Sequence, residues 1–176
     1  MELVSAAPHV FSLLLVLAGV SKLARPSGTR HALRLARLPD GLWLVRGLAL
    51  GEVAVGAAVL LAGGPLAASA LALSYGAFAV FSLRQRARSA DCGCFGDEAA
   101  PAGWSHVMVD LLGAAAGGAA AVVGAPALFD VLAGEPLGGV PALALLVLVT
   151  LLLRLALTAL PDLLATVAQS RGEALA

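Results

Sequence analysis

Apolar residues gather into long runs, each about as long as a bilayer is thick. The runs cover residues of about 6–23, 42–62, 65–83, 104–123 and 141–160. A membrane-spanning helix needs roughly 20 mostly apolar residues. Because the hydrocarbon core offers no water, each run must satisfy its backbone N–H and C=O groups internally, as a helix does. The pattern predicts an all-α polytopic transmembrane helix bundle with five spans, forming a single membrane domain over residues 1–176.

The segment of about residues 27–39, between the first two runs, has two unlike sides. Arg30, Arg34 and Arg37 follow one another at spacings of four and three residues, which places them on one side of a helix. Leucines occupy the opposite side. A short helix with a basic and an apolar side lies in the membrane surface rather than across the membrane. We therefore expect an interfacial amphipathic helix here.

Glycines mark one turn and two sites of helix packing. Gly63–Gly64 leaves room only for a tight turn between the second and third spans. The pairs Gly47 with Gly51, and Gly113 with Gly117, place small residues four positions apart on the second and fourth spans. Such a pattern lets two helices approach closely. We expect these two spans to pack together.

Composition excludes a soluble globular protein and gives no sign of nucleic-acid binding. Hydrophobic residues make up 60% of the 176 residues and charged residues 12%, with a mean hydropathy of +0.96. This leaves too little polar surface to cover a soluble domain. The net charge is +0, so there is no basic excess to bind nucleic acid. Arginine outnumbers lysine ten to one, and Ala and Gly abound, a composition that resembles that encoded by GC-rich bacterial genomes.

The basic residues predict the orientation. All 11 fall on the same face of an alternating five-span arrangement. They are Lys22, Arg25, Arg30, Arg34, Arg37, Arg46, Arg84, Arg86, Arg88, Arg154 and Arg171. Basic loops stay in the cytoplasm. We predict a multi-pass protein of the bacterial cytoplasmic membrane with its N-terminus outside, and with its C-terminus and the polar loop 84–103 in the cytoplasm.

That loop holds the only two cysteines of the chain, in the sequence Cys92-Gly93-Cys94-Phe95-Gly96. A disulfide across one residue lies at the edge of the usual Cα separation, and Gly93 supplies the backbone freedom it needs. A strained disulfide has a raised reduction potential, so it suits exchange chemistry better than permanent cross-linking. The pair predicts a thiol–disulfide redox site whose loop geometry depends on Gly93, Phe95 and Gly96.

Two other interpretations of the cysteines stay open. Soft thiolates bind Zn or Cu(I), so Cys92, Cys94 and His106, with Asp110 beside them, could hold a metal. The spacing does not form a closed four-ligand set, which makes the metal signal weak. The cysteines could also form an inert turn. The chain would then be a non-catalytic assembly or metal-binding subunit.

Three ionisable residues lie inside predicted spans. Glu52 is near the middle of the second span, and His106 and Asp110 share one side of the fourth. Ionisable groups in a bilayer are costly and usually functional. We expect them to handle protons for a thiolate or a bound quinone. The alternatives are a protonated Glu52 bonded to a neighbouring helix, and a His106–Asp110 pair at the headgroup level.

Other polar and aromatic residues of the spans have simpler interpretations. Lys22, Arg46 and Arg154 lie near span ends, so we expect them to extend to lipid phosphates rather than to pair with Asp110. The aromatic residues of the third span are expected to pack against lipid or helix, not around a cofactor. They are Tyr75, Phe78 and Phe81.

Several segments resemble the MauE family of methylamine utilisation proteins. These are Leu17–Leu23, Arg37–Pro39, Glu52 and, most specifically, Cys92–Gly96. The resemblance covers about residues 5–125. The family is similar to the DoxX-like membrane proteins, which implies a four-helix core with the fifth span outside it.

The resemblance implies an accessory protein in the maturation of methylamine dehydrogenase, or disulfide support for another exported protein. Cys92 and Cys94 would be the redox pair. Membrane lipid, the maturing protein and a homo- or hetero-oligomeric partner are the implied contacts, and a subunit of a quinone-linked oxidoreductase is a further hypothesis. An exported substrate needs cysteines outside, whereas the charges place them inside. Either the pair handles electrons from the cytoplasm, or the loop folds back into the bundle, or the orientation is reversed.

Overall fold

The computed structural model describes residues 3–88 and 103–159, and these residues are almost entirely helical. The elements are α1 (Leu3–Ala24), α2 (Ser27–Leu35), α3 (Leu42–Leu61), α4 (Gly64–Ala87), α5 (Trp104–Val123), α6 (Leu128–Ala133), the 3₁₀ turn η1 (Pro136–Gly139) and α7 (Val140–Thr158). Five of them, α1, α3, α4, α5 and α7 with its η1 turn, are long and apolar enough to cross a membrane. The predicted all-α polytopic bundle is confirmed.

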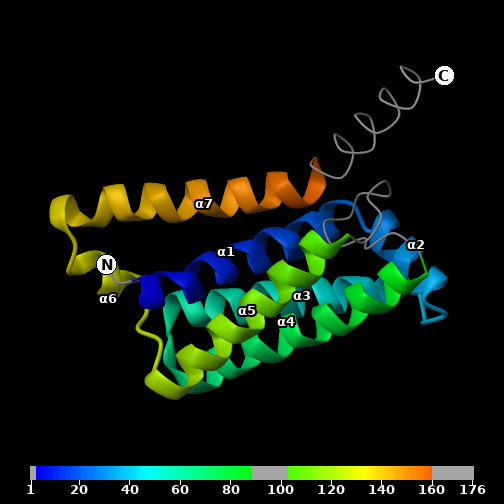
Figure 1. Cartoon of the computed structure of the whole chain (residues 1–176), viewed down its shortest axis with the longest axis horizontal. Helices are drawn as coiled ribbons and strands as arrows, with labels where there is room; N and C mark the ends of the chain where they lie inside the picture. Colours follow the sequence, from blue (N-terminus) through cyan, green and yellow to red (C-terminus); the bar gives the residue numbers. More distant parts are fainter. Residues whose placement is uncertain (1–2, 89–102, 160–176) are drawn as a thin grey trace, which may run out of the picture.

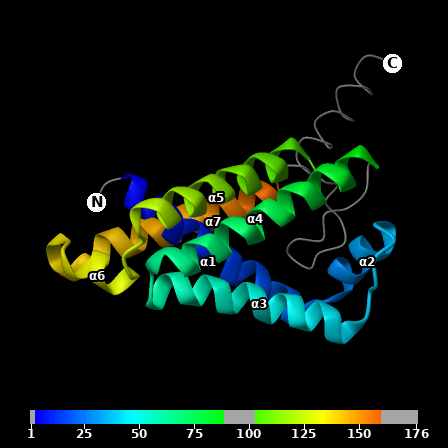
Figure 2. The same cartoon turned by 90° about the horizontal axis from the view of Figure 1, so that it is seen from below.

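The long helices lie along the long axis of the molecule and alternate in direction, so two ends can be defined (Figure 1). The α2 end holds α2, the last turns of α1, α4 and α7, and the first turns of α3 and α5. The α6 end holds α6 and the other terminus of each of these five long helices. Helix α1 packs against α3, α4 packs against α5, and α7 lies along α1 on the outside of the other four (Figure 2). The main apolar core is centred on α1, around Leu14, Leu15 and Tyr75.

Helices α4 and α5 approach most closely at two glycines. A Cβ atom on Gly117 would stand 2.7 Å from the backbone nitrogen of Ala72, and one on Gly113 would stand 2.6 Å from the ring of Tyr75. Both neighbours belong to α4. The expected packing of the second span (α3) against the fourth (α5) is therefore wrong. Gly113 and Gly117 of α5 instead make room for the third span, α4.

Helices α1 and α3 use other glycines than the ones the pattern indicated. A Cβ on Gly19 would stand 2.6 Å from the carbonyl oxygen of Ala49, and one on Gly56 would meet α1 backbone at 2.7 Å. A Cβ on Gly47 or Gly51, by contrast, would have no atom of the described chain within 4 Å. The Gly47 pair therefore faces outward.

The α3–α4 turn is tied to the chain that follows α5. Gly63 has a positive φ of 62°, and a Cβ there would collide with the carbonyl oxygen of Ala125. The Gly64 backbone nitrogen donates a hydrogen bond of 2.7 Å to that same oxygen. This contact fixes the α6 end of the α1–α5 bundle.

Helix α2 is shorter than the expected segment and ends at Leu35. Arg37 adopts a positive φ of 60°, and the Leu38 backbone nitrogen bonds back to Leu33 O at 2.9 Å. This left-handed residue with its long backward hydrogen bond is a helix-terminating motif. The Arg34 guanidinium then contacts Asp40 Oδ2 at 3.0 Å, which closes the connection to α3.

Candidate functional site

A buried ion pair joins α1 to α3 near the α2 end. Lys22 Nζ lies 2.8 Å from Glu52 Oε2, and the two side chains are only 5% and 3% exposed. Gly19, one turn before Lys22, allows this approach, because a Cβ there would stand 3.2 Å from the Glu52 Cβ. The expectation that Lys22 extends to lipid phosphates is therefore wrong. Lys22 points inward and meets the Glu52 carboxylate.

A second polar contact joins α4 to α5 beside the first. The Ser82 hydroxyl donates a hydrogen bond of 2.7 Å to Asp110 Oδ2, and both residues are buried. His106 lies one turn before Asp110 on the same side of α5, and it is buried too. Its Nδ1 atom has no hydrogen-bond partner among the described residues. A buried ring nitrogen without a protein partner can hydrogen-bond to a ligand or take up a proton.

Aromatic rings pack close to the buried ion pair. Tyr75 donates its hydroxyl to the Phe11 carbonyl at 2.8 Å, and its ring meets the Phe78 ring edge-on at 6.0 Å between centroids. Lys22 Nζ lies 5.5 Å from the centroid of Phe78, within reach of a cation–π attraction. The lysine is thus held by a carboxylate and an aromatic face together.

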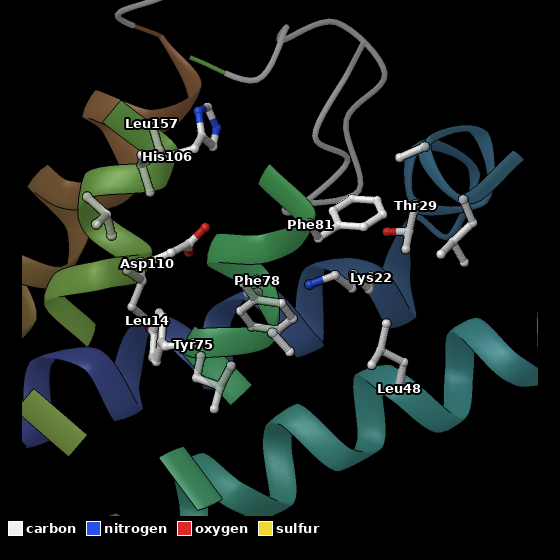
Figure 3. A pocket seen from close by; sticks show the side chains of 16 residues that line it. Leu14, Lys22, Thr29, Leu48, Tyr75, Phe78, Phe81, His106, Asp110 and Leu157 are labelled. Atoms are coloured by element: carbon white, nitrogen blue, oxygen red, sulfur yellow. The ribbon is translucent and has the colours of Figure 1, made fainter. Parts of the chain in front are cut away.

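These groups surround a cavity of about 220 Å³ (Figure 3). Its walls come from α1, α2, α3, α4, α5 and α7 and are mostly aliphatic and aromatic. Lys22, His106 and Asp110 provide ionisable groups in the wall. The charges of Lys22 and Asp110 attract each other, and in Figure 3 the two side chains point toward one another, with the Phe78 ring below the space between them.

A comparison with protein families gives one match. The family model described as methylamine utilisation protein MauE matches residues 1–125. The chain belongs to the MauE family. No curated protein and no solved structure matches it. The region matched to MauE contains α1 to α5 and hence every ionisable residue of the cavity, whereas α6, η1 and α7 follow it.

In this MauE family protein the three ionisable residues expected inside spans come together around one cavity. Glu52 comes from α3, and His106 and Asp110 from α5. Asp110 and His106 line the cavity directly, while Glu52 contacts it through Lys22. These positions are compatible with proton handling. They do not match a His106–Asp110 hydrogen bond, since the partner shown for Asp110 is Ser82.

The cysteine motif lies outside the described residues. Cys92, Gly93, Cys94, Phe95 and Gly96 all belong to segment 89–102. The helices on either side of this segment are described. Their ends meet at the α2 end, where the Arg86 guanidinium lies 4.0 Å above the Trp104 ring.

Metal-ligating residues do not cluster in the described part of the chain. Residues 3–88 and 103–159 contain no group of three or more His, Cys, Asp or Glu residues placed to hold a metal ion. His106, the described member of the weak metal alternative, lines the cavity. Its two expected thiolate partners belong to segment 89–102.

Two polar partners in this MauE family site were missed from the sequence. Ser82 gave no signal, because a serine on an apolar helix commonly bonds to its own backbone. Lys22 did give one: it is the only lysine among 11 basic residues. A mid-span Glu52 needs a buried donor, and the sole lysine, close to the end of a neighbouring span, was available.

Proposed function

We propose that this MauE family protein supports the maturation of a partner protein by cycling Cys92 and Cys94 between dithiol and disulfide. The partner would be of the methylamine dehydrogenase type or another exported protein. In one reaction cycle, the Cys92–Cys94 disulfide accepts two electrons from a pair of partner thiols. The partner gains a disulfide, the protein becomes a dithiol, and the two thiol protons of the partner balance the exchange.

One observation carries the proposal: buried ionisable groups lie between the middle of the bundle and the end to which the cysteine segment is attached. Arg88, the last residue before that segment, and Trp104 both belong to the α2 end. Cys92 follows Arg88 by four residues, and a chain spans at most about 3.6 Å per residue. Covalent geometry therefore keeps Cys92 within about 14 Å of Arg88.

The chemistry of thiol exchange explains why such groups would be useful. Only the thiolate attacks a disulfide, so each reaction cycle requires a group that takes up and returns protons. His106 and Asp110 line the cavity, and the Nδ1 of His106 has no protein partner in the described chain. Buried ionisable residues in a membrane are costly, which favours a functional role for them. We assign proton handling to His106 and Asp110, with Glu52 acting through Lys22.

The basic residues support an orientation for this chemistry. Those of the described chain lie in or beside the elements of the α2 end. By the positive-inside rule we place that end in the cytoplasm and the N-terminus outside. In this orientation Cys92 and Cys94 meet the partner chain on the cytoplasmic side, before its export.

Replacement of each cysteine tests the proposal. Cys92→Ser and Cys94→Ser are each expressed with the partner protein, and the free thiols of the partner are counted by alkylation and mass spectrometry. We expect both variants to leave the partner reduced while still accumulating in the membrane. Ser69→Ala is the matched control, because this hydroxyl bonds only within its own helix, to Pro65 O. Normal partner oxidation in both cysteine variants would refute the redox role.

A further inference from the structure

The cavity has the size and walls of a site for one ring. Its volume of about 220 Å³ lies below the ~300–1,000 Å³ of sites for drug-sized molecules. Phe78, Phe81 and Tyr75 contribute aromatic rings, and aliphatic side chains supply most of the remaining wall. A flat, apolar head group fits these walls, whereas a whole lipid does not.

The cavity also reaches the lipid-facing surface of the bundle. From their shared turn at Gly63, α3 and α4 diverge toward the α2 end (Figure 2). Leu48 on α3 and Ala77 on α4 both line the cavity, and both are exposed residues, Leu48 by 41%. A ligand dissolved in the bilayer can therefore enter sideways and leave a long tail between the two helices.

The polar groups around the cavity select a neutral ligand that has oxygen atoms. Two carboxyl groups, Glu52 and Asp110, face one ammonium group among the described residues at the site, which disfavours a fatty acid or another anion. A small cation is also disfavoured, because Lys22 already occupies the face of Phe78. Lys22 and His106 remain as hydrogen-bond donors for a carbonyl oxygen, and Asp110 as an acceptor for a hydroxyl.

We propose that this cavity binds the head group of a membrane quinone. One quinone oxygen accepts a hydrogen bond from Lys22, the other meets His106, and the ring packs against the other apolar side chains of the wall, which include Phe81 and Leu14. The unpartnered His106 Nδ1, in a side chain only 5% exposed, is the protein atom that such a ligand would satisfy. The isoprenoid tail leaves between Leu48 and Ala77.

Bound in this way, the quinone would be the electron acceptor for the cysteine pair. The Cys92–Cys94 dithiol gives up two electrons and two protons and closes its S–S bond, and the quinone takes them up as a quinol. This acceptor role rests on the proposed redox function. Binding of the quinone does not, since it depends only on the described residues of the cavity.

Binding is tested with the full chain in lipid nanodiscs and a decyl-substituted benzoquinone, by isothermal titration calorimetry. Ala77→Phe narrows the entrance from the lipid side, and we expect it to weaken binding about tenfold, or roughly 1.4 kcal/mol. Ala54→Phe is the matched control on α3: the residue is exposed, does not line the cavity, and should leave Kd within about twofold. Equal binding by wild type and Ala77→Phe would overturn the site.

The polar contact has its own test. His106→Leu removes the ring nitrogen, and we expect a loss of affinity of about tenfold, whereas His106→Gln keeps a hydrogen-bonding group and recovers part of it. Oleate is titrated in parallel. If oleate displaces the quinone at equal concentration, the cavity is a general lipid site and the quinone assignment is wrong.

The acceptor role is tested separately under anaerobic conditions. Reduced protein is mixed with the quinone, and quinol formation is followed by absorbance. We expect one quinol per protein from wild type and none from Cys92→Ser. Quinone binding without quinol formation would remove the acceptor role and leave the site in place. If oxidation of the partner protein continues in a quinone-depleted membrane, the acceptor role of the quinone is wrong, while the redox function of the cysteines still stands.

Discussion

Lys22 and Glu52 join the first and second membrane spans through an ion pair of 2.8 Å that is almost fully buried. Both side chains are almost fully shielded from bulk solvent, so each charge depends on the other. The ammonium group gains a further contact from the Phe78 ring. Breaking such a pair from one side leaves an uncompensated charge, which costs far more than removing both partners. The pair therefore fixes how α1 and α3 meet, and with them one wall of the cavity.

The asymmetry of this pair can be measured. We expect Lys22→Met to lower the free energy of unfolding by about 3–5 kcal/mol, because it strands the Glu52 carboxylate. The double variant Lys22→Met with Glu52→Met should recover most of that loss. Thermal unfolding in detergent, followed by circular dichroism, gives the comparison. Arg46→Met, at an exposed position early in α3, is the control and should change stability by less than about 0.5 kcal/mol. A double variant as unstable as the single one would contradict this account.

Two adjacent glycines of α5 should differ sharply. A Cβ on Gly117 would press on the backbone of α4, 2.7 Å from Ala72 N. At Gly118 nothing in the described chain lies within 4 Å. We expect Gly117→Ala to destabilise the protein by about 1–3 kcal/mol, as overpacking does, and Gly118→Ala to be neutral or slightly stabilising. Unfolding of both variants in one detergent decides the point, and equal behaviour would mean that α4 and α5 pack differently.

The Ser82–Asp110 contact predicts a third pair of variants. Ser82→Ala removes a buried donor from the Asp110 carboxyl group, and we expect a loss of about 1–3 kcal/mol. Ser74 lies two turns earlier on the same helix and donates only to its own backbone, at Ala70 O. Ser74→Ala should therefore stay within about 0.5 kcal/mol of wild type. Equal losses would show that the hydroxyl of Ser82 is not needed by Asp110.

The membrane spans could be predicted because their signal is local. A run of about 20 apolar residues has to form its own backbone hydrogen bonds, whatever it packs against. The basic side of α2 is local as well, although its end at Leu35 depends on the left-handed turn at Arg37. A pattern of charges alone does not reveal such a turn.

Pairing between helices could not be predicted from the same patterns. Gly113 and Gly117 correctly marked a close approach, but small residues on one helix do not say which helix approaches. Gly19 and Gly56 were overlooked, because each acts alone against backbone on the opposite helix. Lys22 illustrates the same limit: near a span end it can reach lipid phosphates or a buried carboxylate, and only the tertiary contact to Glu52 decides.

The side of the membrane on which the α2 end lies determines where the proposed redox pair would meet its substrate. All the basic residues of the described chain lie in or near that end, and the membrane potential and the insertion machinery keep such clusters in the cytoplasm. Exposed positions at both ends allow a direct test. Leu38 follows α2 and is 48% exposed, and Asp130 lies exposed on α6.

Single cysteines at these two positions, in a Cys92→Ser/Cys94→Ser background, are labelled in spheroplasts with a membrane-impermeant maleimide. We expect Asp130→Cys to react at once, and Leu38→Cys to react only after the membrane is permeabilised. The wild-type pair, once reduced, should behave like Leu38→Cys, because the chain keeps Cys92 within about 14 Å and Cys94 within about 22 Å of Arg88 at the α2 end. The opposite pattern at all positions would reverse the orientation, and the pair would then face an exported partner directly. Labelling of Cys92 and Cys94 from the Asp130 side alone would mean that segment 89–102 crosses back into the bundle.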